Sequence, residues 1–183
     1  MEQRAEDSMT ADGFGAWRAE QPDRFELIGG LTVRMMNERT EHASAKAEIA
    51  RQLFAQIPRG APCRVLLDGL AVRVDDANVF EPDLMVQCGA LIAGAMMIDD
   101  PFVVFEILSS STTSFDMLHK VPAYLRMTSL AHVVVLDPAK RRAMLFSKGQ
   151  QETILGGEEA IHLALPGGAV EIALAQVFEG LTP

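Results

Sequence analysis

The sequence predicts an α+β protein in which a mixed β-sheet is flanked by helices and accompanied by additional β-hairpins. The expected order of elements is helix, hairpin, helix, strands, helix, strands, which is typical of this class. The run Phe102-Val103-Val104-Phe105 is continuously apolar, as expected of a central strand buried on both faces. Gly-Gly and Asp-Gly pairs between β-rich runs indicate tight turns.

Length and composition predict one globular domain. A chain of 183 residues, 49% apolar and 22% charged, has room for one well-packed core and little for two. We expect residues 1–8 to form a flexible tail and residues 9–183 to form the domain. The polar N-terminus and the absence of a long apolar run predict a cytoplasmic protein. The two cysteines are too few for a disulfide scaffold or a structural zinc site, which fits a reducing compartment.

The N-terminal third predicts a helix, a hairpin and a second helix. Thr10 is a suitable N-cap for a helix over residues 11–19. The β-rich runs 24–28 and 31–35 flank Gly29-Gly30, which predicts a hairpin. Residues 41–57 follow as a helix. Its expected apolar side consists of Ala43, Ala47, Ala50, Phe54 and Ile57.

The remaining two thirds predict mostly strands. Runs 63–67 and 70–74 flank the turn signal Asp68-Gly69. A helix over 114–127 contains Pro122, which should kink or restart it. The other expected strands are 83–87, 101–108, 132–136 and 143–147, followed by short strands, Gly-rich turns and a last helical turn near 174–178.

Three acidic residues lie within or beside these apolar strands. Glu26 lies between Phe25 and Leu27, Asp83 begins a strand, and Glu106 ends the apolar run. A carboxylate in such a place is costly to desolvate unless a cation or hydrogen bonds compensate. An isolated acid of this kind is usually at a sheet edge or paired with Arg or Lys. If the three converge, they form an oxygen-ligand site for Mg²⁺ or Mn²⁺.

Several segments resemble a known family. Phe80-Glu81-Pro82-Asp83, followed by the run from Val103 to Thr112, resembles the Pro-Asp … Glu-Val-Leu-Ser-Pro-Ser-Thr signature of the Uma-two group of bacterial proteins. Residues 24–30 and 115–124 resemble two further segments of that group, in the same order. The Uma-two group consists of restriction-type endonucleases of the PD-(D/E)xK nuclease superfamily. The resemblance therefore implies a restriction-endonuclease-like fold and a metal-dependent endonuclease that hydrolyses DNA.

The resemblance also implies a set of site residues. Asp83 and Glu106 would bind Mg²⁺ or Mn²⁺, with the backbone carbonyl of Ile107 as a further ligand, and Glu26 would complete the site. The superfamily usually has its lysine two residues after the acid, where this chain has Leu108. In this group the lysine is on the following helix, which makes Lys120 the matching residue.

Other residues near the expected site have two interpretations each. Asp116 and Lys120 are spaced i,i+4, so Asp116 could orient the ammonium group or form a plain surface pair. His42 begins a helix and is either a cap or surface residue or part of the site. The residues Lys140, Arg141, Arg142 and Lys148 surround a turn and either contact DNA or are simply solvated.

The formal net charge of −9 opposes a nucleic-acid partner, since DNA-binding proteins are usually basic on at least one face. Whether the chain is an enzyme is therefore left open by the sequence. The first hypothesis is a Mg²⁺-dependent endodeoxyribonuclease, for which the resemblance also implies a homodimer. The alternatives are a non-catalytic binding or assembly protein with the same fold, and a hydrolase of another phosphorylated substrate.

Overall fold

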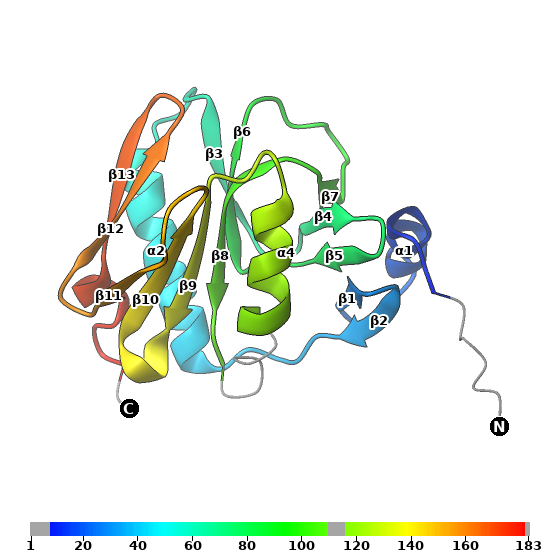
Figure 1. The fold of residues 1–183 in the computed structure, drawn as a ribbon, viewed down its shortest axis with the longest axis horizontal. Coiled ribbons are helices and arrows are strands. Elements are labelled where there is room, and N and C mark those ends of the chain that lie inside the picture. The colour runs from blue at the N-terminus through cyan, green and yellow to red at the C-terminus, as the bar shows by residue number, and fades with distance from the viewer. Residues whose placement is uncertain (1–7, 110–115, 182–183) are drawn as a thin grey trace.

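The computed structural model describes residues 8–109 and 116–181, in which two main sheets and a separate hairpin are packed with helices (Figure 1). The predicted tail of residues 1–8 lies, apart from Ser8, outside the described residues. The observed architecture is mixed α and β, as predicted. None of the helices in the described ranges has the length and apolar character needed to cross a lipid bilayer.

The larger sheet has six strands in the order β11-β10-β9-β8-β6-β3. Strand β8 lies inside it, parallel to β9 and antiparallel to β6, so the sheet is mixed. Phe105 packs into one apolar cluster and Val104 into another, which confirms that β8 is buried on both faces. The strands are β3 (Cys63–Leu67), β6 (Leu84–Cys88), β8 (Pro101–Ile107), β9 (His132–Asp137), β10 (Arg142–Ser147) and β11 (Thr153–Gly156).

The second sheet contains the predicted N-terminal hairpin. Ile28 pairs with Leu31 across a two-residue turn, and Gly29 and Gly30 have φ angles of 57° and 84°. Two consecutive positive φ angles suit glycine and match the twist of a tight hairpin. The strand order is β2-β1-β5-β4-β7. Its strands are β1 (Phe25–Ile28), β2 (Leu31–Arg34), β4 (Ala71–Asp75), β5 (Asn78–Phe80) and β7 (Met97–Ile98).

Helices cover both faces of the six-stranded sheet (Figure 1). The long helix α2 (Thr40–Gln56) packs on one face, and α4 (Val121–Arg126) packs on the other. Helix α1 (Ala11–Arg18) packs beside the smaller sheet, and Thr10 caps it as predicted. The chain ends with the hairpin β12 (Ala160–Leu165) and β13 (Gly168–Ala173) and the short helix α5 (Leu174–Val177).

The predicted apolar side of the second helix is wrong for most of its members. Ala43 and Ala47 are exposed, and Phe54 keeps 56% of its surface accessible. The buried side consists of Ala45, Ile49, Ala50, Gln52 and Leu53. Gln52 explains the rotation, because its side-chain amide bonds the backbone N–H and C=O of Ala173 in β13. A polar residue therefore faces the interior.

The Asp68-Gly69 turn forms, but the strands on either side of it do not pair with each other. Strand β3 pairs with β6 in the larger sheet, whereas β4 pairs with β5 and β7 in the smaller one. The Gly69 N–H donates to a carboxylate oxygen of Glu81, at 2.8 Å. This buried acid thus holds the turn at which the chain passes from one sheet to the other.

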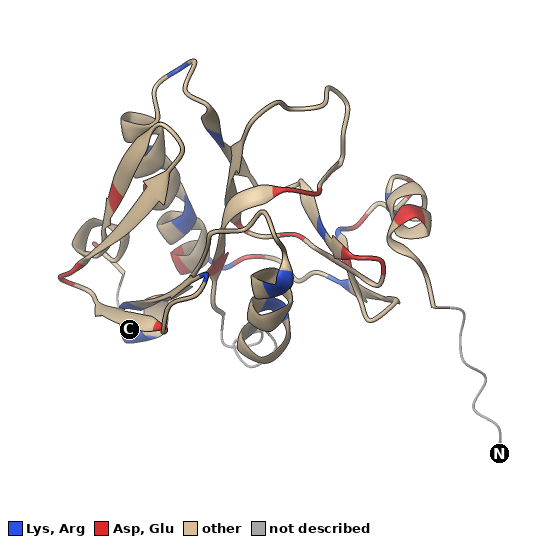
Figure 2. Cartoon of the chain, turned by 45° about the horizontal axis from the view of Figure 1, so that its top comes forward, with Lys and Arg blue, Asp and Glu red and all other residues tan. Residues whose placement is uncertain are grey.

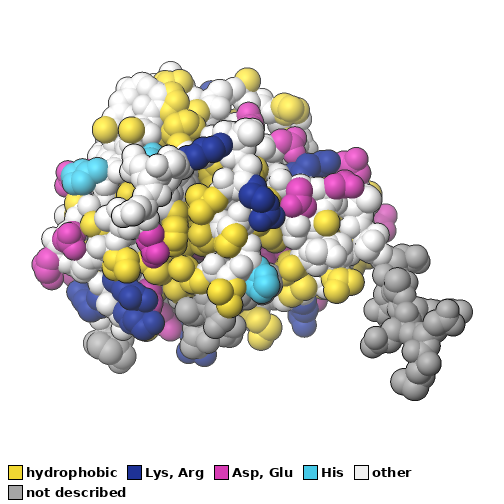
Figure 3. Space-filling view, viewed as in Figure 1, with side chains coloured by type: hydrophobic (Ala, Val, Ile, Leu, Met, Phe, Trp, Pro, Cys, Tyr) yellow, Lys and Arg dark blue, Asp and Glu magenta, His cyan; other side chains and the backbone are white. Residues whose placement is uncertain are grey.

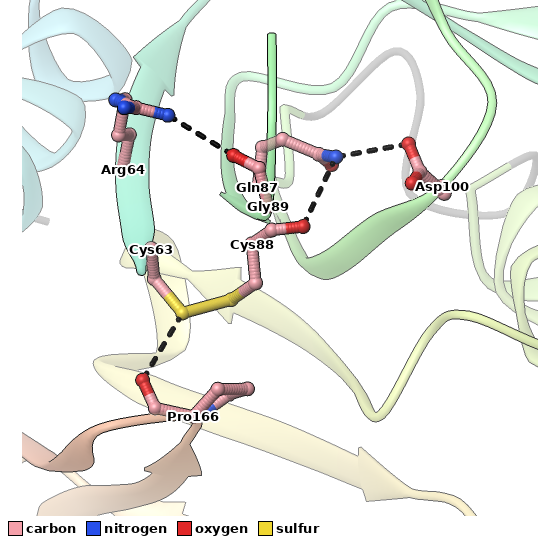
Figure 4. The surroundings of a disulfide bond; sticks show 7 residues. All are labelled: Cys63, Arg64, Gln87, Cys88, Gly89, Asp100 and Pro166. Atoms are coloured by element: carbon pink, nitrogen blue, oxygen red, sulfur yellow. Dashed lines mark hydrogen bonds between the residues drawn. A yellow bond between two sulfur atoms is a disulfide. The ribbon is translucent and has the colours of Figure 1, made fainter. Parts of the chain in front are cut away.

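The two cysteines form a disulfide that the sequence did not predict. Cys63 in β3 and Cys88 in β6 are register partners with their Cα atoms 3.9 Å apart, and their sulfur atoms are bonded (Figure 4). The bond joins two neighbouring strands of the larger sheet at the end of β6 remote from Asp83. The cytoplasmic location stays a prediction from sequence.

Candidate active site

A cavity of about 520 Å³ is formed by residues of both sheets, the segment before α2 and the turn before α4. One wall is apolar and comes from the N-terminal hairpin and the residues after it: Ile28, Leu31, Val33, Met35 and Met36. The ionisable residues that line the cavity are Arg24, Glu26, Arg34, Glu38, Arg39, His42, Glu81, Asp83, Glu106 and Lys120. All four residues predicted as catalytic therefore line one cavity.

Lys120 reaches the cavity because of an irregular helix start. A π-helical turn, Asp116–Lys120, precedes α4, and Pro122 occupies the first turn of that helix, where no backbone N–H is required. Pro122 thus restarts the helix, one of the two outcomes expected. Only 6% of the surface of Lys120 is exposed. The side chain of Asp116 lies outside the described part of the chain, so its predicted role stays a prediction.

Two acids flank the buried ammonium group. The Lys120 Nζ lies 2.8 Å from Glu26 Oε1 and 3.6 Å from Glu106 Oε1. Glu26 also accepts the backbone N–H of Glu81 at 2.8 Å, and Glu106 accepts the hydroxyl of Tyr124 at 2.9 Å. Both carboxylates are buried and both are paired with a cation. This contact fits a catalytic lysine, and it equally fits the structural alternative of a paired acid.

Leu108 occupies the position at which the superfamily usually has its lysine, and it is buried in an apolar environment. Leu108 packs with Val104 in the apolar cluster beneath α4. Residues two apart on a strand share a face, so Leu108 and Glu106 point to the same side of β8 as Val104. The π-helical turn before α4, the helix that covers this side, supplies Lys120 instead.

Asp83 lies beside Glu106 at the ends of neighbouring strands. The Asp83 N–H donates to the Phe105 carbonyl at 3.1 Å, so Asp83 and Glu106 follow the paired ladder of β6 and β8. Asp83 Oδ2 accepts the backbone N–H of Ile107 at 2.7 Å. The contact of Ile107 with Asp83 is thus made by its N–H, and its carbonyl stays a predicted ligand.

The other oxygen of Asp83 faces His42. The His42 Nε2 lies 3.2 Å from Asp83 Oδ1, and its Nδ1 lies 3.5 Å from Glu38 Oε2. One ligand atom from each of Glu38, His42 and Asp83 can be chosen so that all three lie within 4.8 Å of one another. Among residues 8–109 and 116–181 this is the group of three or more His, Cys, Asp or Glu with that spacing, and it differs from the predicted set of Glu26, Asp83 and Glu106.

The charges around His42 alter its titration. Burial alone would lower the pKa of His42, but the hydrogen bond and charge of Asp83, together with Glu38, outweigh burial and raise that pKa above its usual value. Lys46 is a neighbour of the same acids: it pairs with Glu38, and its Nζ lies 3.0 Å from Asp68 and 4.0 Å from Asp83. Over the described chain, Lys and Arg positions lie interspersed with Asp and Glu positions (Figure 2).

Glu81 is a second buried acid, and it holds the frame of the cavity. Its carboxylate has ion pairs with Arg18 of α1 and Arg24 before β1, in addition to the hydrogen bond from Gly69. Only 2% of Glu81 is exposed. Its oxygens are thus occupied by three donors from three segments, which is a structural role.

Sequence reasoning missed Glu38, Glu81 and Tyr124 as residues of this region. A usable signal existed for two of them. Glu38 precedes His42 by four residues, and Tyr124 follows Lys120 by four, so each pair shares a helical face or its extension. Glu81 offered no such signal, because its partners are distant in the chain.

The basic turn predicted to contact DNA or solvent makes contacts within its own chain. Lys140 and Arg142 pair with Asp137, at 3.3 and 3.5 Å. Arg141 donates to the Phe178 carbonyl, and Lys148 donates to two backbone carbonyls. None of these four cations lines the cavity.

The fold and the cavity together define an α+β protein of the restriction-endonuclease-like class, with acids at strand ends and a lysine beside them. The model of the Uma2 family, described as "Putative restriction endonuclease", matches residues 11–175. The chain belongs to this family, which is the Uma-two group that its sequence resembles.

Comparison with solved structures supports the same fold. A crystal structure from Anabaena variabilis, described as "a putative nuclease belonging to DUF820", superposes with a TM-score of 0.70 and 16% identity. The match covers 93% of this chain and 97% of that one. No curated protein that was compared matches this chain.

Proposed function

We propose that this protein is a divalent-cation-dependent endonuclease that hydrolyses phosphodiester bonds of DNA in the 520 Å³ cavity. The observation that carries the proposal is the position of Lys120, whose buried ammonium lies between Glu26 and Glu106. Asp83 lies at the neighbouring strand end. Membership of a family described as restriction endonucleases supports the choice of reaction.

The donor atoms suit a hard divalent cation. Carboxylate oxygens of Asp83 and Glu106 at adjacent strand ends, with the Ile107 carbonyl, are ligand types that Mg²⁺ and Mn²⁺ accept. A bound cation would lower the pKa of a coordinated water and stabilise charge on the scissile phosphate.

The remaining steps belong to residues of the chain. Lys120 orients the attacking water and offsets the negative charge that develops on the phosphate. Glu26 holds the ammonium in place through the 2.8 Å contact. Tyr124 orients Glu106 through its hydroxyl hydrogen bond.

Plasmid cleavage tests the proposal. The parent should convert supercoiled plasmid to nicked and linear forms with Mg²⁺ or Mn²⁺, and EDTA should stop the conversion. Glu106→Gln and Lys120→Arg should each slow cleavage by about 10²-fold or more. Lys140→Met is the matched control, because Lys140 is exposed and lies outside the cavity.

The alternatives give different results in the same assays. A non-catalytic binding protein would leave the plasmid intact under every condition. A hydrolase of another phosphorylated substrate would leave the plasmid intact and still cleave bis(p-nitrophenyl) phosphate in a manner that depends on Glu106. Cleavage that persists unchanged in both active-site variants would end the proposal.

A further inference from the structure

We propose that the apolar wall of the cavity binds the base of an unpaired nucleotide, so that the protein acts on single-stranded DNA in preference to an intact duplex. The inference names the substrate class of the site described above and therefore rests on the proposed function. The apolar wall consists of Ile28, Leu31, Val33, Met35 and Met36. None of these side chains has a part in the hydrolysis argued above.

Strand β2 exposes an apolar face to this cavity. It is an edge strand of the smaller sheet, and all four of its residues are exposed. Its apolar residues, Leu31 and Val33, alternate with polar ones and therefore share one face. Such alternation is typical of a strand with one buried face, yet both side chains stay exposed, as does Met36 after the strand. Exposed apolar surface with a polar surround marks a binding groove.

The register of the N-terminal hairpin places this face beside the proposed catalytic groups. Val33 lies directly opposite Glu26, and Leu31 lies opposite Ile28. Directly opposed residues point to the same side of a sheet, with Cβ atoms about 4.5–5.5 Å apart. Glu26 in turn lies 2.8 Å from the Lys120 ammonium. A phosphate held at Lys120 would thus have its attached nucleoside against the apolar wall.

The side chains of the apolar wall suit the flat face of a base. They carry no strong hydrogen-bonding group, so they cannot read base edges in a duplex groove as polar side chains do. They can pack against a base, and the thioethers of Met35 and Met36 favour contact with aromatic rings. Base faces are covered by their neighbours in a duplex and become accessible when a nucleotide is unpaired and unstacked. The wall therefore selects unpaired nucleotides, with little preference among bases.

The size and charge of the cavity agree with this ligand. Its volume of about 520 Å³ lies within the range of roughly 300–1,000 Å³ that is typical of sites enclosing one small molecule. Arg39 lines the cavity and is exposed. It forms no ion pair with the described residues, whereas the other basic residues of the lining do. Arg39 is thus available for the phosphate of a neighbouring nucleotide.

Fluorescence anisotropy of labelled DNA with Mn²⁺ tests the inference. The Glu106→Gln variant, whose cleavage should be slow, allows binding to be measured. It should bind a single strand of mixed sequence at least about tenfold more tightly than the duplex of that sequence. A strand of abasic tetrahydrofuran residues keeps the phosphates without the bases, and it should lose most of this affinity.

Substitutions in the apolar wall supply the second arm of the test. Added to Glu106→Gln, Leu31→Gln and Met36→Gln should each weaken single-strand binding by roughly 3- to 10-fold and change duplex binding little. Ile154→Gln is the matched control. Ile154 lies on β11, an edge strand of the larger sheet, outside the cavity, and is 59% exposed against 55% for Leu31. Because all three residues are exposed, the variants should fold, which thermal unfolding checks.

The outcomes separate this inference from the proposed function. Equal affinity for single strand and duplex, or single-strand affinity unchanged by Leu31→Gln and Met36→Gln, overturns the inference even if the parent cuts plasmid. Binding that depends on the bases and on Leu31, in a parent that cuts no DNA, upholds the base site and rejects the proposed function. A second copy of the chain on the wall would appear in sedimentation as a dimer that Leu31→Gln dissociates. Such a dimer, with equal binding of normal and abasic strands, also overturns the inference.

Discussion

At the scale of single residues, Lys120 forms ion pairs with two buried acids. Lys120→Met would leave Glu26 and Glu106 buried without this partner, and we expect it to lower the free energy of unfolding by about 3–5 kcal/mol. Urea denaturation measures the change. Lys140→Met is the control, because an exposed pair with Asp137 contributes about 1 kcal/mol or less.

A double variant separates the buried charge from general disruption. Glu26→Gln combined with Lys120→Met removes one of the uncompensated charges, so the pair should be less destabilised than the sum of the single changes. Strictly additive effects would show that the ion pair does not couple these residues.

The titration of His132 should make the free energy of unfolding depend on pH. Burial lowers the pKa of His132 below its usual value, despite a backbone hydrogen bond at Ala164 that acts in the opposite direction. Between the lowered and the usual pKa, near 6.5, the unfolded chain binds more protons than the folded one, so stability rises with pH. The contribution is present above about pH 6.5 and is lost as the pH falls towards the folded pKa.

Thermal unfolding between pH 7.5 and 5.5 checks this effect. The parent should lose more stability over that range than His132→Gln, which no longer titrates there. His162→Gln serves as the control, because the His162 side chain is 71% exposed. An equal loss in parent and His132→Gln would contradict the assignment.

At the scale of elements, substitutions on the two sides of helix α2 test which side is buried. Leu53 is fully buried, whereas its neighbour Phe54 is 56% exposed. Leu53→Ala should therefore lower the free energy of unfolding by about 2–5 kcal/mol. Phe54→Ala should cost about 1 kcal/mol or less, as is usual at exposed positions. Denaturant titration of both variants measures the difference, and the reverse order would support the helix side expected from sequence.

Local patterns predicted the elements better than their partners. The Gly29-Gly30 hairpin and the buried strand β8 follow from turn chemistry and apolar runs, which act over a few residues. The buried side of α2 could not be predicted in this way, because Gln52 faces inward only once β13 lies beside it. The passage of the chain from one sheet to the other at Gly69 could not be predicted either. The turn there is held by Glu81, whose arginine partners are distant in the sequence.

The candidate site shows the same division. Glu26, Asp83, Glu106 and Lys120 were found because acids in apolar strands are costly and because the family resemblance pointed to them, and all four line the cavity. The individual contacts of these residues were not predictable from the sequence. Asp83, for example, contacts His42, because the fold places the start of α2 beside the start of β6. Whether these residues act in catalysis stays a prediction for the assays above.

At the scale of the whole molecule, the disulfide joins β3 and β6, which are neighbouring strands of the larger sheet but distant in the sequence. Cys63 and Cys88 close a loop with a sequence separation of 25. Constraint of the unfolded chain by such a loop contributes about 3 kcal/mol. Reductant should therefore lower the thermal unfolding midpoint of the parent and leave that of a Cys63→Ser, Cys88→Ser variant unchanged. Two thiols that react in the native, unreduced protein would contradict the bond.

The net charge of −9 and the arrangement of cations decide how DNA can be approached. On the face shown in Figure 3, Lys and Arg side chains are scattered among acidic and apolar ones and do not form one basic patch. Arg142 is engaged with Asp137, as is Lys140. If the protein cleaves DNA as proposed, contact with phosphate would therefore depend on the bound divalent cation more than on a basic patch of this face.

This dependence predicts that DNA binding requires the cation. Glu106→Gln, whose cleavage should be slow, allows binding to be measured by fluorescence anisotropy of a labelled duplex. With Mn²⁺ the affinity should be at least about tenfold higher than with EDTA, a difference of ~1.4 kcal/mol. Asp83→Asn, which removes a charged ligand of the proposed cation, should reduce this gain. Equal affinity with Mn²⁺ and EDTA would instead mean that DNA contacts a surface other than this cavity, because the acids within it repel phosphate in the absence of a cation.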